Sequence, residues 1–302
     1  MSGVAPVNAP QPGILALGTP AHAYLEFDLA AGANPAGLAS AVAALAQAQT
    51  TGGGLNLVVG LRPELWRKVA PDDAPEGLSG FDAKVVGVEG FSMPATQHDA
   101  VVWIAGAAPD AVFDAAAGAI ASLARVATLV SETVGWPYQG HRDLTGFIDG
   151  TENPPVGEAQ AVALVADGHP GAGGSVLLLQ KWMHDAATWN ALPAAEQEKI
   201  MGRRKPDSVE LEDKPESSHV ARTDQDEFGK IVRRNMPVGT ASEHGTMFVG
   251  FCASQRPLAA MLDSMAGKTT GVRDALTRFS RPISGAYYFV PALTALQRIA
   301  AA

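Results

Sequence analysis

Three segments of this 302-residue chain carry side chains whose types could do chemistry together. GFIDGTEN contains Asp149, KPESSHVARTD contains His219, and KIVRRNMPVG contains Arg233 and Asn235. A carboxylate can move a proton, an imidazole can move a proton or bind a metal, and a guanidinium can stabilise developing negative charge. Each also has a structural interpretation, because Asp149 and Gly150 form an ordinary turn pair, and a lone histidine or an arginine pair is common at a surface.

Motifs for other common chemistries fail at specific positions. AGKTT resembles the end of a phosphate-binding loop, but Leu262 stands where that motif needs its first glycine. IDGT resembles a phosphatase signature, but Phe147 replaces its nucleophilic aspartate. The glycine-rich segment DGHPGAGGS lacks the glycine order of a dinucleotide site, and no serine nucleophile elbow occurs. Nucleotide binding and serine hydrolase chemistry are therefore not favoured.

The composition predicts an ordinary folded protein, with 47% hydrophobic and 18% charged residues. A formal net charge of −9 argues against nucleic acid as a partner, because phosphate binding needs a positive surface. The single cysteine, Cys252, excludes an internal disulfide and lies in an apolar run, where we expect it to be buried. No signal peptide or membrane-spanning run is recognisable, so we expect a cytoplasmic protein.

The first half of the chain follows the order strand, helix, strand, strand, helix, strand. Asn34 is a suitable N-cap for the first helix, and Pro35 suits its first turn. This is the element order of a ferredoxin-like unit. The predicted strands cover residues 21–30, 55–61, 99–107 and 128–135, and the predicted helices cover residues 34–50 and 109–127.

The second half repeats this order more loosely, with a bend expected near Pro193 and a long polar insert at residues 203–234. We therefore predict an α+β fold of two ferredoxin-like units, each an antiparallel sheet with helices packed on it. The N-terminal ferredoxin-like domain would cover residues 1–145 and the C-terminal one residues 146–302. Within the second half, the predicted strands cover residues 174–185, 245–254 and 283–291, and the predicted helices cover residues 186–203 and 255–267.

Several segments, in order along the chain, resemble the dye-decolorising peroxidases, in particular their short bacterial B-type. The most specific is the signature G-F-x-D-G-x-x-N, which is filled here by GFIDGTEN. GRRKPDSVELEDKPESSHVART, IVRRNMPVG and RFSRPISGAYYFVP follow it, and PQPGILALG and MPATQHDAVVWIAG precede it. The resemblance therefore covers nearly the whole chain, and the pairing of the signature with a downstream S-H and R-x-N argues against accidental agreement.

The resemblance implies a haem peroxidase with haem b (iron protoporphyrin IX) bound in the C-terminal half. His219 would be the axial ligand of the haem iron, and Asp274, matched only by its neighbourhood, would accept a hydrogen bond from its other ring nitrogen. Asp149 would be the distal base, Arg233 the distal cation, and Asn235 would orient peroxide or water. Because a nearby guanidinium stabilises a carboxylate, we expect the pKa of Asp149 to be lowered. Whether Asp149 or Arg233 dominates the cleavage of the O–O bond stays open.

The same resemblance implies further contacts with haem. Phe248 would pack on its distal face, and Arg203 and Arg222 would meet its propionates, although each arginine could equally be a surface charge. Glu152 alone is weak evidence for a manganese site, since a hard cation needs several oxygen ligands. Four aromatic residues could relay electrons, but packing is their commoner role: Trp182, Trp189, Tyr287 and Tyr288. Besides Arg222, the implied haem contacts are Ile148, Gly150, Thr151, Glu152, Arg203, His219, Arg233, Phe248 and Asp274.

The function implied is reduction of hydrogen peroxide, through a ferryl intermediate, with oxidation of dyes, phenols or similar small-molecule reductants. A haem carrier or sensor, or a protein that releases iron from haem, is the alternative. A carrier does not need both Asp149 and Arg233, so their joint presence favours the peroxidase. The family commonly forms oligomers, and we expect a homo-oligomer. The final segment YYFVPALTALQRIAAA has no Gly-Ser-Leu-like tail, so encapsulin docking is not expected.

Overall fold

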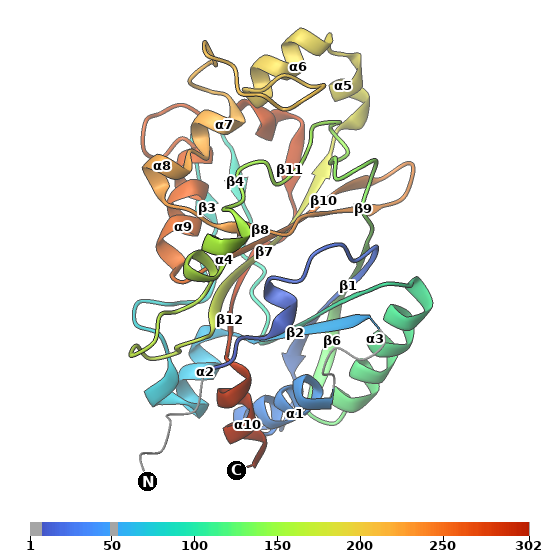
Figure 1. The fold of residues 1–302 in the computed structure, drawn as a ribbon, viewed down its shortest axis with the longest axis vertical. Helices are drawn as coiled ribbons and strands as arrows, with labels where there is room; N and C mark the ends of the chain where they lie inside the picture. The colour runs from blue at the N-terminus through green and yellow to red at the C-terminus, as the bar shows by residue number, and fades with distance from the viewer. Residues whose placement is uncertain (1–7, 49–53, 302) are drawn as a thin grey trace.

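The computed structural model describes residues 8–48 and 54–301. The fold is α+β, with helices packed around a ten-stranded antiparallel sheet (Figure 1). The first half contains η1 (Pro12–Ile14), β1 (Ala21–Leu29), α1 (Pro35–Ala48), β2 (Leu55–Leu61), α2 (Pro63–Val69), η2 (Pro71–Asp73), β3 (Val85–Val86), β4 (Ser92–Met93), β5 (Ala100–Gly106), α3 (Pro109–Leu123) and β6 (Ala127–Gly135).

The second half adds shorter helices around three long strands, and its polar insert is only partly helical. It contains α4 (Val156–Ala163), β7 (Ser175–His184), α5 (Ala186–Ala191), α6 (Ala194–Met201), α7 (His219–Arg222), α8 (Gln225–Phe228), β8 (Val232–Arg233), β9 (Met236–Gly239), β10 (His244–Cys252), α9 (Gln255–Met265), η3 (Ala275–Arg278), β11 (Ser280–Pro282), β12 (Ala286–Val290) and α10 (Leu293–Ala301). None of the helices in the described ranges is long and apolar enough to cross a membrane.

Local sequence accounts for several helix ends. Asn34 caps α1 as predicted, because its Oδ1 accepts a hydrogen bond from the backbone N–H of Gly37 at 2.7 Å. The predicted helix over residues 186–203 is two helices, α5 and α6, because Pro193 lacks the N–H and clashes with the preceding turn. The last two residues of the predicted helix 34–50 lie outside the described ranges.

The strands of the two halves join into one sheet, which the element order did not predict. The strand order is β11-β7-β12-β2-β5-β1-β6-β9-β10-β8, and β7 also pairs with β10, so eight of these strands close into a ring. The halves meet through single residue pairs, Phe289 with Leu61 and Gly135 with Val238. The strand residues on one face form one buried cluster inside the ring, which includes Tyr24, Trp103, Phe251 and Tyr288.

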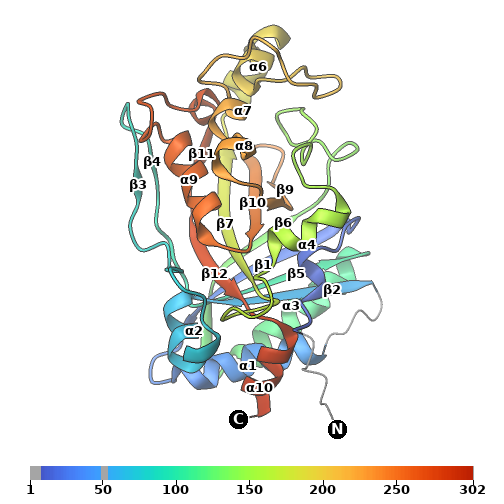
Figure 2. The same cartoon turned by 60° about the vertical axis from the view of Figure 1, so that its left-hand side comes forward.

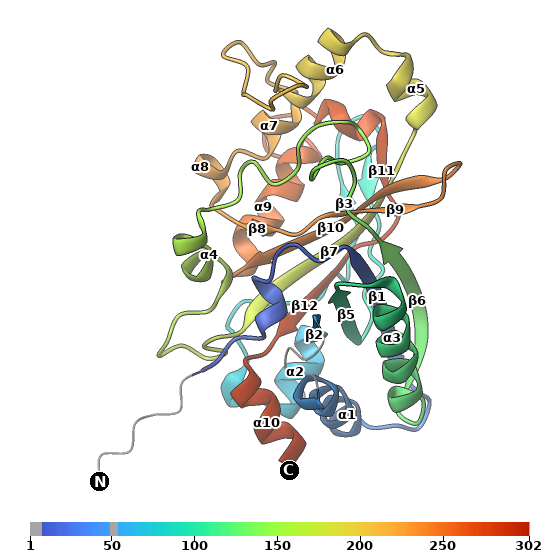
Figure 3. The ribbon, with the colours of Figure 1, turned by 45° about the vertical axis from the view of Figure 1, so that its right-hand side comes forward.

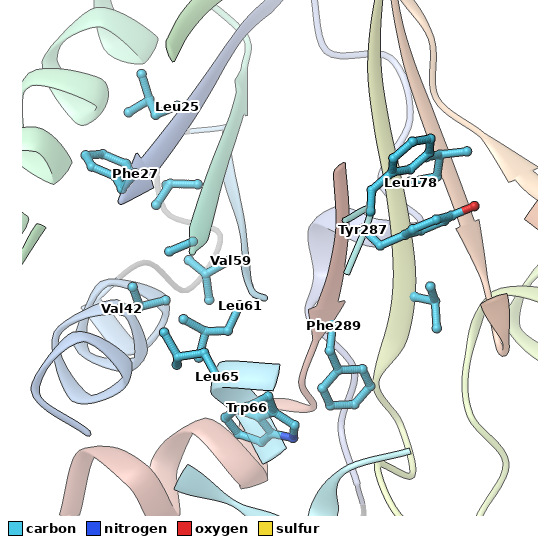
Figure 4. Close-up of a cluster of buried hydrophobic side chains, with 14 of the residues drawn as sticks. Leu25, Phe27, Val42, Val59, Leu61, Leu65, Trp66, Leu178, Tyr287 and Phe289 are labelled. Carbon is cyan, nitrogen blue, oxygen red and sulfur yellow. The ribbon is translucent and has the colours of Figure 1, made fainter. Parts of the chain in front are cut away.

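Helices cover the outside of the ring and create the second core. Figure 3 shows α3 beside β1, and α1 beside α10. In Figure 4, Val42 of α1 and Trp66 of α2 lie near Val59 and Leu61 of β2, with Phe289 of β12 on the other side of the indole. The rings of Trp66 and Phe289 have centroids 5.8 Å apart. On the other half, α7, α8 and α9 lie along β7 and β10, where the candidate site forms (Figure 2).

The β7–β10 pairing under the candidate site tolerates no side chain at Gly245. A Cβ atom added there would lie 1.8 Å from the backbone oxygen of Trp182. Gly245→Ala should therefore lower the free energy of unfolding by about 1–3 kcal/mol, measured by urea denaturation. Gly118→Ala is the matched control: its Cβ, on the exposed face of α3, would meet nothing within 4 Å. That variant should be more stable by about 0.5–1 kcal/mol. Equal stability of the Gly245→Ala variant and the wild type would contradict this packing.

Candidate active site

One cavity of about 290 Å³ gathers the residues that the sequence pointed to. Its lining comes from the loop between β6 and α4, from β7 and β10, from the segment around β8, and from α7 and α9. Asp149, His219, Arg233 and Asn235 all line it. Of the other implied haem contacts, Asp274 and Arg222 lie outside the lining; those that line it are Ile148, Gly150, Thr151, Glu152, Arg203 and Phe248.

A tight ladder in the loop after β6 presents Asp149. The backbone N–H of Asp149 donates to the oxygen of His141 at 2.8 Å, and that of Asp143 donates to the oxygen of Phe147 at 2.9 Å. This pairing places Asp143 and Asp149 as diagonal neighbours on the same face of the ladder, and both line the cavity. The left-handed backbone of Gly150, with φ of +76°, then turns the chain away.

The structure contradicts the expected lowering of the pKa of Asp149. Burial, and then the negative charge of Asp143, raise the pKa of Asp149 to about 6, although Arg233 opposes this shift. Burial also raises the pKa of Asp143. The lowered pKa was predicted from the nearby guanidinium of Arg233 alone, without the effects of burial and of Asp143. Asp143 was missed, because an aspartate six residues earlier in a loop gives no local signal that the two carboxyl groups share one face.

Arg233 and Asn235 are held by backbone contacts that join the two sequence motifs. The side chain of Asn153, at the end of GFIDGTEN, accepts from the N–H of Arg233 at 2.7 Å and donates to its carbonyl at 2.9 Å. Asn235 accepts from the N–H of Val249 at 3.0 Å and donates to Oδ1 of Asp149 at 3.2 Å. Burial lowers the pKa of Arg233, and Asp149 opposes this shift. Hydrogen bonds therefore fix the Asn235 amide against the Asp149 carboxyl and tie the backbone of Arg233 to the same loop.

His219 begins α7, which the hydroxyl of Ser218 caps. Its Nδ1 lies 2.7 Å from Oδ2 of Asp274, and Asp274 is completely buried. The other oxygen of Asp274 accepts the backbone N–H of Leu276 at 2.9 Å. A carboxylate only accepts hydrogen bonds, so this contact suits a tautomer with the proton on Nδ1 and the lone pair on Nε2. This arrangement orients the imidazole and makes it a stronger ligand.

Of the two arginines predicted to contact haem propionates, Arg203 lines the cavity and Arg222 does not. Arg203 forms ion pairs with Glu152 and, at 3.3 Å, with Glu210. Arg222 does not line the cavity, and its guanidinium donates to the hydroxyl of Thr270 at 2.7 Å. The described residues include no cluster of three or more His, Cys, Asp or Glu side chains suited to a metal ion.

The four aromatic residues considered for electron relay and the single cysteine are all buried in the protein. Trp182 lines the cavity and is 7% exposed, and the three other aromatic residues considered for electron relay are also buried: Trp189, Tyr287 and Tyr288. Cys252 is buried as expected, and burial raises the pKa of its thiol.

The remaining walls suit a large, flat, mainly apolar group. Phe248 of β10 and four residues of α9 supply apolar surface: Leu258, Met261, Leu262 and Met265. Gln180 lines the same cavity, and its amide nitrogen is buried without a hydrogen-bond partner among the described residues. This cavity brings together an imidazole, a carboxyl group and a guanidinium, which are side-chain types suited to ligating haem iron, moving a proton and stabilising charge. The fold and site thus have the arrangement of the haem peroxidase class.

Comparison with known proteins identifies the family. The family model "Dyp-type peroxidase, N-terminal" matches residues 11–137, and "Dyp-type peroxidase, C-terminal" matches residues 140–295. A dye-decolorizing peroxidase of Rhodococcus erythropolis is 37% identical over 249 residues, which are 79% of this chain and 72% of that protein. The chain belongs to the Dyp-type peroxidase family.

Solved structures agree with this assignment over nearly the whole chain. A Dyp-type peroxidase protein of Shewanella oneidensis has a TM-score of 0.88 and 33% identity, covering 96% of this chain and 98% of that one. DyPB of Rhodococcus jostii RHA1 has a TM-score of 0.86 and 32% identity, with the same coverage. A variant of the Rhodococcus jostii protein, solved in complex with haem, is 31% identical and has a TM-score of 0.86, covering 97% of this chain and 99% of that one.

The raised pKa of Asp149 predicts a specific pH dependence of stability. Its pKa rises from 3.8 to about 6 on folding, so the folded protein binds more protons between these values. The stabilising contribution of protonated Asp149 to the free energy of unfolding is therefore complete below about pH 4, and it is lost as the pH rises through about 6. Asp149→Asn in the haem-free protein should therefore gain about 2 kcal/mol relative to wild type between pH 4 and pH 7.5, measured by urea unfolding. Asp114→Asn, on the exposed face of α3, is the control, and an equal Asp149→Asn difference at both pH values would exclude the assigned shift.

Proposed function

We propose that this chain is a haem-dependent peroxidase of the short B-type, which reduces hydrogen peroxide and oxidises dyes, phenols or similar small reductants. The observation that carries the proposal is that Asp149, Arg233 and the carboxylate-backed His219 line one cavity. Relatives named dye-decolorizing peroxidase and the haem complex of the Rhodococcus jostii variant support it.

The cofactor in this proposal is haem b. Nε2 of His219 would bind the iron, and Asp274 would keep the imidazole oriented and electron-rich. Arg203 would face a propionate, with Ile148, Gly150, Thr151 and Glu152 near the same edge. Phe248 and α9 would pack against the ring. Haem, when bound, supplies the iron at which peroxide binds and the electrons that reduce it.

Polar side chains of this protein would transfer the proton of peroxide and stabilise the negative charge that develops on it. Asp149, as a carboxylate, would take the proton from the inner oxygen of peroxide and return it to the outer oxygen, which leaves as water. Arg233 would stabilise the negative charge that develops as the O–O bond breaks. Asn235 donates to Oδ1 of Asp149, so it would orient the carboxylate and a neighbouring oxygen. A pKa near 6 suits a group that must both accept and return a proton.

A haem carrier or sensor, or a protein that releases iron from haem, is the alternative. Such a protein needs His219 and apolar walls but has no use for a carboxyl beside a guanidinium. The hydrogen bonds that hold Asp149 and Arg233 at one cavity therefore favour the peroxidase.

The fold proposal is that each half is a ferredoxin-like unit, with a boundary between residues 145 and 146. The neighbour order β2-β5-β1-β6 in the first half, and β12-β7-β10 followed by β8 and β9 in the second, supports it. The family models meet close to this boundary, between residues 137 and 140. A homo-oligomeric state and a cytoplasmic location follow from the family resemblance and the sequence composition and are proposals of the same kind.

Removing the distal groups should abolish fast reaction with peroxide. Asp149→Ala and Arg233→Ala should each lower the second-order rate constant by about 10²- to 10⁴-fold, because each loses a group that acts on the breaking bond. In the wild type, the rate should fall as the pH drops through about 6, where Asp149 becomes protonated. The measurement is stopped-flow absorbance of the haem protein mixed with one equivalent of hydrogen peroxide. A wild type that does not react would support the carrier instead.

Removing the proximal imidazole should act on cofactor binding. His219→Ala should lower haem occupancy and shift the Soret band, because the iron loses its protein ligand. Asp274→Asn should keep haem but weaken the Fe–N(His) stretch in the resonance Raman spectrum, because an amide polarises the imidazole less. Full occupancy and an unchanged Soret band in His219→Ala would rule out His219 as the ligand.

A further inference from the structure

Arg234 stands between two residues of the candidate site but faces the other side of the sheet. Successive side chains of a strand point to opposite faces, so Arg233 and Asn235 line the cavity while Arg234 points into the ring of strands. Arg234 is only 5% exposed. Its guanidinium carbon lies 5.0 Å from the ring centroid of Trp103 on β5.

The partners of this buried cation come from the N-terminal half. Nη1 of Arg234 donates to the backbone oxygen of Gly13 at 3.2 Å and to that of Ile14 at 3.4 Å, both in η1. Among the described residues, no carboxylate lies within ion-pair distance of it. Burial lowers the pKa of Arg234 to about 10. A buried cation without an anionic partner is costly, so an apolar side chain of similar length would fold at least as well.

The segment that contains Arg234 is held by backbone pairs and by one buried side chain. β8 pairs with β10 through two residue pairs, Arg233 with Gly250 and Val232 with Phe251, and β9 continues the same register through four more. A shift by one residue would turn Arg233 and Asn235 into the ring and bring Arg234 to the cavity. In the observed register, Arg234 stacks on Trp103 and reaches the two carbonyl groups of η1. A shifted chain would lose these contacts.

We propose that Arg234 is a positioning residue of the candidate site. Its guanidinium, held by Trp103, Gly13 and Ile14, adds to these backbone pairs and stabilises the register that presents Arg233 and Asn235 to the cavity. This inference rests on the proposed peroxidase function for its consequence, but the register itself can be measured without it.

Arg234→Met in the haem-loaded protein tests the inference, with Arg234→Lys as the conservative variant and Arg125→Met, at an exposed site after α3, as the control. In Arg234→Met, the backbone N–H groups of Arg233 and Val249 should exchange with deuterium at least ten-fold faster, because their acceptors on Asn153 and Asn235 move. Amides of β1 and β5 should be unchanged. The midpoint of thermal unfolding should not fall, whereas the rate constant with peroxide should drop at least ten-fold.

Arg234→Lys keeps the charge but not the planar stack, so it should fall between the wild type and Arg234→Met in both exchange and rate. If Arg234→Met does not fold, Arg234→Lys is judged by the same measurements. The proposal would be overturned if Arg234→Met showed wild-type exchange at Arg233 and Val249 and a wild-type rate constant with peroxide. It would also be overturned if exchange were faster throughout the sheet and the midpoint of thermal unfolding were lower, because Arg234 would then be only a general stabilising residue. A wild type inert to peroxide would refute the proposed function alone, because the exchange of Arg233 and Val249 would still decide the register.

Discussion

The two-residue period of the chain through β8 is the constraint on which the site depends. It sends Ile231, Arg233 and Asn235 to the cavity and Val232 and Arg234 into the ring of strands. The clamp from Asn153 then ties this segment to the loop that carries Asp149. The loop of Asp149 and the segment of Arg233, 84 residues apart in sequence, are thus joined by hydrogen bonds between the Asn153 side chain and the backbone of Arg233, without a direct ion pair between the carboxyl and the guanidinium.

The distal electrostatics follow from this arrangement. Asp143 and Asp149 lie on one face of a short ladder, where the surrounding protein raises the pKa of each carboxyl group. The negative charge of Asp143 raises the pKa of Asp149 further, and the guanidinium of Arg233 only partly opposes this increase. Arg233 is itself surrounded by protein, which lowers its pKa, so the cation and the carboxyl limit each other's desolvation cost. The balance leaves Asp149 with a pKa of about 6, where a proton can be both taken and returned at little cost.

Local sequence patterns were sufficient for most of the long strands and helices. β1 and β2 were predicted because their residues are rich in β-formers, and α1 because Asn34 can cap it and Pro35 suits its first turn. The joining of the halves was not predictable, because it depends on single pairs such as Phe289 with Leu61, which leave no periodic signal. At the site, family signatures pointed to Asp149 and His219, which line one cavity. Asp143 could not be found in this way, since its effect arises only when the ladder folds.

Asp274, which is buried, and Asp149, which faces the cavity, illustrate how the environment separates the roles of two carboxyl groups. Asp274 is completely enclosed, and its two oxygens accept from an imidazole and from a backbone N–H. Asp274 does not line the cavity and reaches it through His219, which suits an anchor. Asp149 accepts from the N–H of Gly150 and from Asn235 through the same oxygen, Oδ1, which leaves Oδ2 free of these bonds at the cavity. Oδ1 holds the side chain in place, and Oδ2 can contact a reactant. A group that transfers protons needs both properties.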